Sequence, residues 1–459
     1  MSIKQRRILY IFFILIFLII TPLISLYATG YKIGGDFKIQ KTGALIIDTT
    51  PPGAKISLNS KTQKKFLKNI FTKNNGYLLS PAKIKNLKPG EYDVLLELPG
   101  HWSWQKKLNI KPGKSTYIED VNLFKNDVPI LVSNGNFNDF IINPKDENIV
   151  AIDNNSLKLI NQTNFEINNF DFASSSFSQK NNEINLKNIV FSPNKERLII
   201  NNFIFDENDW KNPIDLKKII GENLSEIKWG NDNIIYYQEK NNIYSFNLNS
   251  KLSKNILKSS EINDFIIKED LLYTIEADIS STFLNVWDLK KNEYLKKISL
   301  PFSRYKFINP EHSLINLYEY EHKILHLIDP FSEFRPLKET INNISEDCTW
   351  INENKLLYHN DSEIWILDII NGSSVKKTLL TRISEKIKNA IWHSSNNYVF
   401  YEVENKIRTI ELDDRNNYNI TEIINLKNLE NIYLNKKGNL IFFYAKIGNQ
   451  EGIYKLYIQ

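Results

Sequence analysis

The chain has 459 residues, of which 42% are hydrophobic and 24% are charged, and its formal net charge is +5. This length is sufficient for two or three domains with ordinary hydrophobic cores. Because Lys4, Arg6 and Arg7 lie at the extreme N-terminus, the rest of the chain lacks the concentrated basic face that nucleic-acid binding requires, so no nucleic-acid partner is expected. The single cysteine, Cys348, excludes an intrachain disulfide, and cysteine usage therefore does not indicate the compartment.

The N-terminal segment predicts a membrane anchor. A basic tail, residues 1–7, precedes the stretch 8–28, which is apolar and carries no charged residue. As an α-helix this stretch would be about 31 Å long, which matches a bilayer core of about 30 Å. Since basic flanks favour the cytoplasmic side, we expect residues 1–7 in the cytoplasm, residues 8–28 as a single transmembrane helix, and the bulk of the chain outside the cytoplasm. The alternative is a signal peptide cleaved near residues 28–30, which would release a secreted protein.

Residues 29–42 form a polar linker, and residues 43–124 predict a small β-domain. Within this domain, apolar runs with the alternation typical of strands are separated by Pro-Gly turn signals at Pro89–Gly90, Pro99–Gly100 and Pro112–Gly113. We therefore expect a small sheet structure directly after the linker.

Four short motifs follow one another in this domain, namely Pro51–Ala54, Ser80–Pro81, Leu87–Tyr92 and Gly100–Trp104. Their order resembles the PEGA family, in which a Pro-Glu-Gly-Ala turn is followed by Thr-Pro, Leu-x-Pro-Gly-x-His/Tyr and Gly-Tyr-x-x-Trp. The second residue of the first motif departs from the family, because Pro stands in place of Glu. Residues 62–79 depart further, with a long Lys- and Phe-bearing insertion where the family has a short turn. The resemblance implies a small extracytoplasmic β-sandwich without catalytic residues.

From Asn138 to Gln459, a motif of about forty residues recurs eight times, a period typical of propeller blades. Each copy contains three apolar runs separated by polar turns, and the third run closes on a large apolar residue followed in most copies by a carboxylate or amide. The closing positions are Asn161, Asp206, Asn247, Asp288, Asp329, Asp368, Glu411 and Tyr457. Sheets of this kind bury both faces only against neighbouring sheets, so the repeat predicts a ring of stacked sheets.

We therefore expect residues 125–459 to form a β-propeller of eight blades, or of seven if the first or second copy is degenerate. The last copy ends on its third strand, so residues 128–132 are expected to supply the fourth strand of that blade. Trp287–Asp288 lies where a Trp-Asp pair closes a strand, and the repeat resembles WD40-like and TolB-like propellers at the level of fold, without the His and Gly of full WD40 repeats. The predicted fold class is mainly β: a transmembrane helix, a PEGA-like β-sandwich and a propeller.

The repeat columns are interpreted as structural. A carboxylate or amide that ends a strand accepts hydrogen bonds from the turn that follows it. Aromatic residues at one position of the first run are interpreted as fillers between blades. These residues are Phe191, Trp229, Phe307, Trp350, Trp392 and Tyr433.

Two side-chain groups are candidates for a site. His322 and His326, with Glu321 and nearby His312, form the one group of possible metal ligands. Residues four apart in a strand are about 13 Å apart, too far to share one zinc ion, so a bend or a partner strand would be needed.

Trp102 and Trp104 lie two residues apart and so on one strand face. They are interpreted as packing of the small domain, and the alternative is a carbohydrate-stacking platform. We predict no catalytic, cofactor-binding or metal-binding residues, and the sequence leaves the binding residues unknown.

The sequence favours a non-enzymatic, membrane-anchored extracytoplasmic protein whose propeller is a binding or scaffold surface for cell-envelope components or protein partners. The alternative is an extracytoplasmic hydrolase or lyase that acts on glycans with acid and base carboxylates in the propeller channel. A third hypothesis is a periplasmic partner of an envelope machine, as TolB-like propellers are. Two carboxyl groups within about 5–10 Å in an open central pocket would favour the enzyme.

Overall fold

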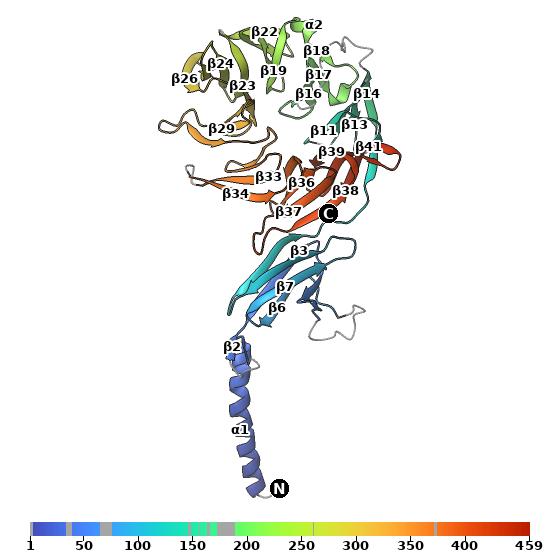
Figure 1. Cartoon of the computed structure of the whole chain (residues 1–459), viewed down its shortest axis with the longest axis vertical. Coiled ribbons are helices and arrows are strands. Elements are labelled where there is room, and N and C mark those ends of the chain that lie inside the picture. Colours follow the sequence, from blue (N-terminus) through green and yellow to red (C-terminus); the bar gives the residue numbers. More distant parts are fainter. Residues whose placement is uncertain are drawn as a thin grey trace. The chain divides into compact units, whose positions relative to one another are not determined.

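The computed structural model describes residues 3–33, 39–64, 76–145, 148–154, 156–162, 166–171, 189–259, 261–370 and 374–459. The chain forms two compact units, and strands predominate in both (Figure 1). The first unit comprises Met1–Val128, Ile410–Thr421 and Tyr457–Gln459, and the second comprises Pro129–Thr409 and Glu422–Leu456.

The first unit begins with a long apolar helix, α1 (Ile3–Ala28), none of whose residues is buried. Its most apolar window has a mean hydropathy of 2.8, and the helix is long and apolar enough to cross a membrane. The helix predicted over residues 8–28 is thus present and begins earlier, within the basic tail. It ends where the Thr29 backbone N–H donates to the Ser25 carbonyl (2.9 Å) and Gly30 takes a φ of +84°, a conformation that favours glycine at a helix end.

After α1, the described residues up to Asn122 form a short strand pair and two sheets that share one core. The pair is β1 (Tyr31–Ile33) with β2 (Ile39–Lys41). One sheet has the order β6 (Ala82–Leu87), β3 (Gly43–Thr50), β9 (Ser115–Asn122), and β3 runs parallel to β9. The other has the order β5 (Lys61–Thr62), β4 (Lys55–Leu58), β7 (Gly90–Glu97), β8 (Trp104–Ile110). Leu45 and Ile118 of the first sheet and Ile56 and Val94 of the second belong to one buried cluster. The unit is therefore built as a β-sandwich.

Two of the sequence motifs meet in this sandwich. The Ser80 hydroxyl accepts a hydrogen bond from the Ala54 backbone N–H (2.9 Å), and the Ser80 backbone N–H donates to the Ala54 carbonyl (2.9 Å). In the insertion over residues 62–79, Lys64 pairs with Tyr77 in an isolated bridge. Residues 65–75 of that insertion lie outside the described residues.

Eight four-stranded sheets follow along the described part of the chain after Pro129. The first three are β11 (Asp139–Ile142), β12 (Ile149–Ile152), β13 (Ser156–Ile160), β14 (Ile167–Asp171); β15 (Val190–Phe191), β16 (Arg197–Ile200), β17 (Phe203–Asp206), β18 (Ile214–Asp215); and β19 (Leu224–Asn231), β20 (Ile234–Glu239), β21 (Asn242–Asn247), β22 (Leu252–Lys258). The next two are β23 (Ile262–Lys268), β24 (Leu271–Ala277), β25 (Thr282–Asp288), β26 (Glu293–Leu300); and β27 (Tyr305–Ile308), β28 (Ile315–Glu319), β29 (Ile324–Ile328), β30 (Leu337–Ile341).

The last three sheets are β31 (Thr349–Asn352), β32 (Lys355–His359), β33 (Glu363–Ile370), β34 (Ser374–Arg382); β35 (Ile387–Trp392), β36 (Tyr398–Val403), β37 (Lys406–Glu411), β38 (Ile420–Asn425); and β10 (Ile130–Asn134), β41 (Gln450–Tyr457), β40 (Leu440–Ile447), β39 (Lys427–Leu434). A 3-10 helix, η3 (Glu207–Asp209), and the short helix α2 (Leu216–Ile220) flank β18 in the second sheet.

The last sheet is completed from the beginning of the region, because β10 pairs with β41. This confirms that the segment before the first copy supplies the missing strand, displaced to Ile130–Asn134 from the predicted residues 128–132. Phe140 and Ile149 of the first sheet share a buried cluster with Phe442 and Ile453 of the last, so the run of sheets closes on itself.

Candidate functional site

The first strands of successive sheets carry polar side chains that bond from sheet to sheet. We call Asp139, Lys228, Asp264, Lys306, Glu346, Lys388 and Asn431 the first-strand polar set. Lys228 Nζ on β19 lies 3.4 Å from Asp264 Oδ1 on β23. Asp264 Oδ2 in turn accepts a hydrogen bond from the Phe307 backbone N–H on β27 (2.9 Å). These contacts join three consecutive first strands through one buried carboxylate.

The same arrangement continues around the unit. Lys306 Nζ lies 2.9 Å from Glu346 Oε1, just before β31. Lys388 Nζ on β35 donates to the Leu429 carbonyl on β39 (3.1 Å). Asn431 Nδ2 then donates to Asp139 Oδ1 on β11 (2.8 Å), which links the last sheet to the first.

Burial and neighbouring charges act on these groups in opposite directions. Burial raises the pKa of Asp264, and the Lys228 ammonium opposes that shift. Burial likewise raises the pKa of Glu402, whose Oε1 lies 3.1 Å from Lys388 Nζ. Burial lowers the pKa of Lys306, but the hydrogen bond and charge of Glu346 outweigh it and the pKa lies above its usual value. The carboxylates Asp264, Glu346 and Glu402 thus each have an ammonium partner.

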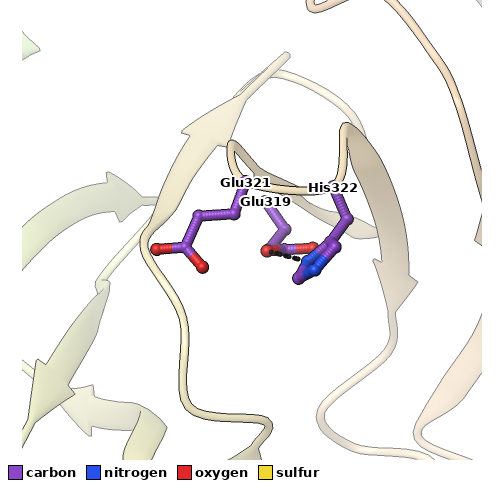
Figure 2. Close-up of side chains that lie close together, drawn as sticks. All are labelled: Glu319, Glu321 and His322. Carbon is purple, nitrogen blue, oxygen red and sulfur yellow. Dashed lines mark hydrogen bonds and ion pairs between the residues drawn. The ribbon is translucent and has the colours of Figure 1, made fainter.

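A turn between β28 and β29 brings together three possible metal ligands, Glu319, Glu321 and His322, whose ligand atoms lie within 4.8 Å of one another. Figure 2 shows the three side chains projecting from this turn, with the Glu319 carboxylate joined to the imidazole of His322. Glu319 Oε1 lies 2.9 Å from His322 Nδ1 and also accepts a hydrogen bond from the Ser303 hydroxyl.

The Glu319 carboxylate is buried and His322 is exposed. Burial raises the pKa of Glu319, but the hydrogen bonds from Ser303 and His322 outweigh it and hold the pKa below its usual value. Among the described residues, Glu319, Glu321 and His322 form the group that could offer three ligands to one cation.

The histidines singled out in the sequence do not gather. His322 lies in the turn, whereas His326 on β29 contacts the Thr340 hydroxyl (3.3 Å). The His312 ring stacks on Trp350 with centroids 3.6 Å apart. Glu319 was missed by the sequence interpretation, which considered Glu321 and the three histidines and placed His322 and His326 on one strand. The signal available was a carboxylate at the end of the second run, three residues before a histidine.

Several positions of the repeat columns behave as interpreted. Asn247 Oδ1 accepts hydrogen bonds from the backbone N–H groups of Asn249 (2.9 Å) and Ser250 (3.0 Å), and Asp288, Asp329 and Asp206 accept bonds from their own turns in the same way. Trp229 packs among residues of the preceding sheet, and its indole N–H donates to the Val190 carbonyl (2.9 Å). The turn interpretation is confirmed at those four positions, and the filler interpretation at Trp229.

Trp104 is buried, and its indole N–H donates to Glu411 Oε2 (3.1 Å). The packing interpretation is therefore confirmed for Trp104. Two residues further along β8, the buried Lys106 ammonium lies 3.1 Å from Glu411 Oε2 and 3.3 Å from Asp413 Oδ2. Arg415, in the same segment, pairs with Asp413 (2.7 Å). These contacts lie within the first unit and fix the segment Ile410–Thr421 to its second sheet.

Three exposed apolar side chains lie on the segment of the Glu319 turn and on segments bonded to it in sequence. Ile279, Phe302 and Tyr320 are 99%, 64% and 45% exposed, and we call them the exposed apolar face. Their segments are bonded to one another: the Tyr320 backbone N–H donates to the Arg304 carbonyl (3.2 Å), and the Thr282 hydroxyl approaches the Ser303 carbonyl (3.5 Å).

Tyr320 of the exposed apolar face lies near the first-strand polar set, because the charge of Lys306 acts on its hydroxyl and opposes the rise that burial causes in the Tyr320 pKa. In antiparallel sheets, the turn between second and third strands lies at the end where the first strand begins. The opposite end of the same sheet carries Phe334, which is 97% exposed, in the connection between β29 and β30.

Four-stranded sheets that pack on their neighbours and close into a ring define a β-propeller. No protein-family model matches this chain, and no curated protein matches it. Among solved structures, the C-terminal WD40 domain of Sif2 is 12% identical, covers 72% of this chain and 98% of that chain, and has a TM-score of 0.48. The Dos1 propeller is 13% identical, with coverage of 73% and 96% and a TM-score of 0.44.

A structure described as the eukaryotic initiation factor is 8% identical, with coverage of 70% and 85% and a TM-score of 0.48. All three scores are below 0.5. The propeller assignment therefore depends on the strand pairing and the closing cluster of this chain itself.

Proposed function

We propose that this chain is a non-enzymatic, membrane-anchored binding protein. In this proposal α1 crosses a bilayer once with its basic end in the cytoplasm, a PEGA-like sandwich follows outside, and an eight-bladed propeller binds a cell-envelope protein. The exposed apolar face carries the proposal, because Ile279, Phe302 and Tyr320 stand exposed on segments that hydrogen-bond one another.

The composition of that face favours a protein partner. Covering exposed aromatic and aliphatic side chains with a partner removes apolar surface from water and so lowers the free energy. Interface hot spots are rich in Tyr and other large side chains. Polar groups lie at its edge, since Glu321 and His322 (Figure 2) are exposed and directly follow Tyr320 in the chain. A protein surface with apolar anchors and polar rim contacts is complementary to such a face.

The paired carboxylates of the first-strand polar set and its neighbours favour binding over catalysis. A glycan hydrolase needs one carboxyl that gives up a proton and a second that acts as base or nucleophile. Asp264, Glu346 and Glu402 are instead held by Lys228, Lys306 and Lys388. The pairs of Asp264 and Glu346 join one sheet to the next, whereas Lys388 and Glu402 lie on the neighbouring strands β35 and β36 of one sheet.

A photo-cross-linking experiment tests the proposed face. A photoreactive amino acid is placed at Phe302 in the full chain in cells, with Phe334 as the matched position at the opposite end of the same sheet. We expect one discrete protein adduct from position 302 and none of that mass from position 334. Tyr320→Ser, combined with the probe at 302, should reduce the adduct. Equal adducts at both positions, or an adduct insensitive to Tyr320→Ser, would contradict the proposal.

The location is tested separately with a C-terminal alkaline phosphatase fusion, which is active only outside the cytoplasm. Phosphatase activity is expected. An inactive phosphatase fusion, together with activity of a cytoplasmic reporter fused at the same position, would contradict the proposed orientation. The hydrolase alternative is tested by incubating the purified chain with envelope glycans, where newly released reducing ends would favour an enzyme and overturn the binding proposal.

A further inference from the structure

A cavity of about 230 Å³ lies where α1 meets the β1–β2 pair. Its wall is mostly apolar or aromatic, and it is formed by Leu23, Leu26, Tyr27, Tyr31, Lys32 and Ile39. Tyr27 and Ile39 are 59% and 55% exposed, so a large part of the wall is open to its surroundings. Exposure of such a surface to water is unfavourable, because the free energy of the chain rises with the apolar area in contact with water.

The β1–β2 pair is attached to the end of the helix. The Thr29 hydroxyl donates to the Ser25 carbonyl (2.8 Å), which closes the last helical turn. Thr42, directly after β2, donates to the Gly30 carbonyl from both its backbone N–H (2.7 Å) and its hydroxyl (2.6 Å). The strand pair therefore cannot move far from the point at which the helix ends.

The length of the helix sets the depth of this cavity if α1 crosses a bilayer. A helix of 26 residues is about 39 Å long, which exceeds a bilayer core of about 30 Å. Tyr31 follows the helix end at Ala28 by three positions, so the β1–β2 pair must lie in or next to the headgroup layer. Tyrosine is enriched at that depth, and lysine side chains reach the headgroups from it.

We propose that the β1–β2 pair lies in the membrane interface and that a phospholipid of the bilayer occupies the cavity, with its glycerol end and upper acyl chain against Leu26, Tyr31 and Ile39. This inference rests on the proposed membrane anchoring. Lys32, which is exposed beside the cavity, is placed to pair with the phosphate group. The occupant explains why apolar side chains line an open cavity at the base of an otherwise well-packed sandwich.

Spin-label accessibility tests the depth. The full chain is reconstituted in vesicles of phosphatidylcholine and phosphatidylglycerol, with a nitroxide on a cysteine introduced at Phe13, Ile39 or Val128. The native Cys348 does not compete for the label, because it is buried and burial raises the pKa of its thiol to about 12. Collision with oxygen is compared with collision with a water-soluble nickel chelate.

We expect the oxygen-to-nickel ratio at position 39 to lie between those at positions 13 and 128. Position 128 serves as the aqueous control because it is exposed and lies beyond the sandwich strands. A ratio at 39 equal to that at 128, with position 13 in lipid, would overturn this inference and leave the anchoring intact. A water-like ratio at position 13 would overturn the anchoring itself, and this inference with it.

A phospholipid with a photoreactive group near the glycerol end of its acyl chain tests the occupant. Adducts are mapped by mass spectrometry to residues 39–41, and we expect them in the native chain. Ile39→Asp places a charge in the cavity wall and should abolish them, whereas Gln40→Asp adds the same charge at an exposed neighbour that does not line the cavity. No adduct in the native chain, or equal yields from the two variants, would overturn the proposed occupant.

Discussion

The sandwich of the first unit and the sheets of the second bury their apolar residues in different ways. The sandwich has one core, to which both of its sheets contribute. In the second unit, each cluster is shared by neighbouring sheets, as where Ile199 and Ile204 of the second sheet pack with Ile235 and Phe246 of the third. The sandwich depends on contacts between segments distant in sequence, whereas the second unit repeats the contact between one sheet and the next.

This difference explains why the second unit shows a repeat in its sequence and the sandwich does not. A sheet that packs on two similar neighbours must present similar residues to each, so the same columns recur along the chain. A sandwich has no such requirement, because each of its strands meets a different environment. The comparison predicts where substitutions in each region have their largest effects.

The largest effect is expected where the ring of sheets closes. Phe140 on β11 is fully buried, and its ring lies 5.0 Å from that of Tyr433 on β39 in an edge-to-face contact. Phe140→Ala removes a large buried side chain between the first and last sheets, so we expect a loss of about 3–5 kcal/mol in the free energy of unfolding. Chemical denaturation followed by tryptophan fluorescence measures it.

Phe334→Ala is the matched control, because that ring is 97% exposed and its removal should change stability by no more than about 0.5 kcal/mol. Equal losses in the two variants would mean that the contact between the first and last sheets contributes nothing to stability.

The second effect tests the sandwich through its buried ammonium. Lys106→Met removes the partner of Glu411, whose side chain is only 6% exposed. Leaving a buried charge unpaired costs about 3–5 kcal/mol, and we expect the lower end because Trp104 and Asn419 still donate to Glu411. Thermal melting measures the loss, and the double variant Lys106→Met/Glu411→Gln should recover part of it. No recovery would show that Lys106 acts by packing alone.

The same variant predicts a pH dependence. Burial raises the pKa of Glu411, and Lys106 opposes that shift, so removing Lys106 raises the folded-state pKa further. A carboxyl whose pKa is higher in the folded state binds its proton more tightly there, and stability falls as pH rises from the unfolded-state pKa to the folded-state pKa. The melting-temperature deficit of Lys106→Met should therefore be smaller at a pH of about 5 than at about 7.5. The neighbouring Asp413 keeps its Arg415 partner in the variant. A deficit that is constant with pH would contradict this assignment.

The sequence predicted what the ring of sheets requires and missed what depends on distant contacts. The eight copies, their closing carboxylates and the strand supplied by β10 are visible because each recurs or completes a column. Nothing local indicates that Trp104 bonds Glu411, since the two lie 307 positions apart. The ligand group at Glu319 was missed because a turn bends the chain where alternation alone predicts a straight strand. The partners within the first-strand polar set could not be predicted either, because they depend on which strands lie next to one another in the folded chain.

The third effect tests the charges that join consecutive sheets. Asp264→Asn removes the charge that faces Lys228 and weakens the bond from the Phe307 backbone N–H, so we expect a loss of about 1–3 kcal/mol in the second unit. Asp270→Asn is the control, because Asp270 pairs with Lys290 at the exposed surface, where such pairs contribute little. Denaturant midpoints measure both losses. A loss for Asp270→Asn as large as that for Asp264→Asn would show that burial of the pair does not matter.

The smallest effect separates two roles within one repeat column. Asn247 Oδ1 accepts two backbone N–H groups of its own turn, so Asn247→Ala should cost about 0.5–1.5 kcal/mol, the net value of a typical hydrogen bond. Asp368 occupies the same column in the sixth sheet but lies within β33, and its carboxylate pairs with Lys355 (3.4 Å). Both partners of that pair are partly exposed, and exposed pairs are screened by solvent, so Asp368→Ala should cost less than Asn247→Ala. Equal losses would show that position in the repeat, and not the turn bond, sets the contribution. A larger loss at Asn247 would show that the column is maintained by turn geometry, one sheet at a time.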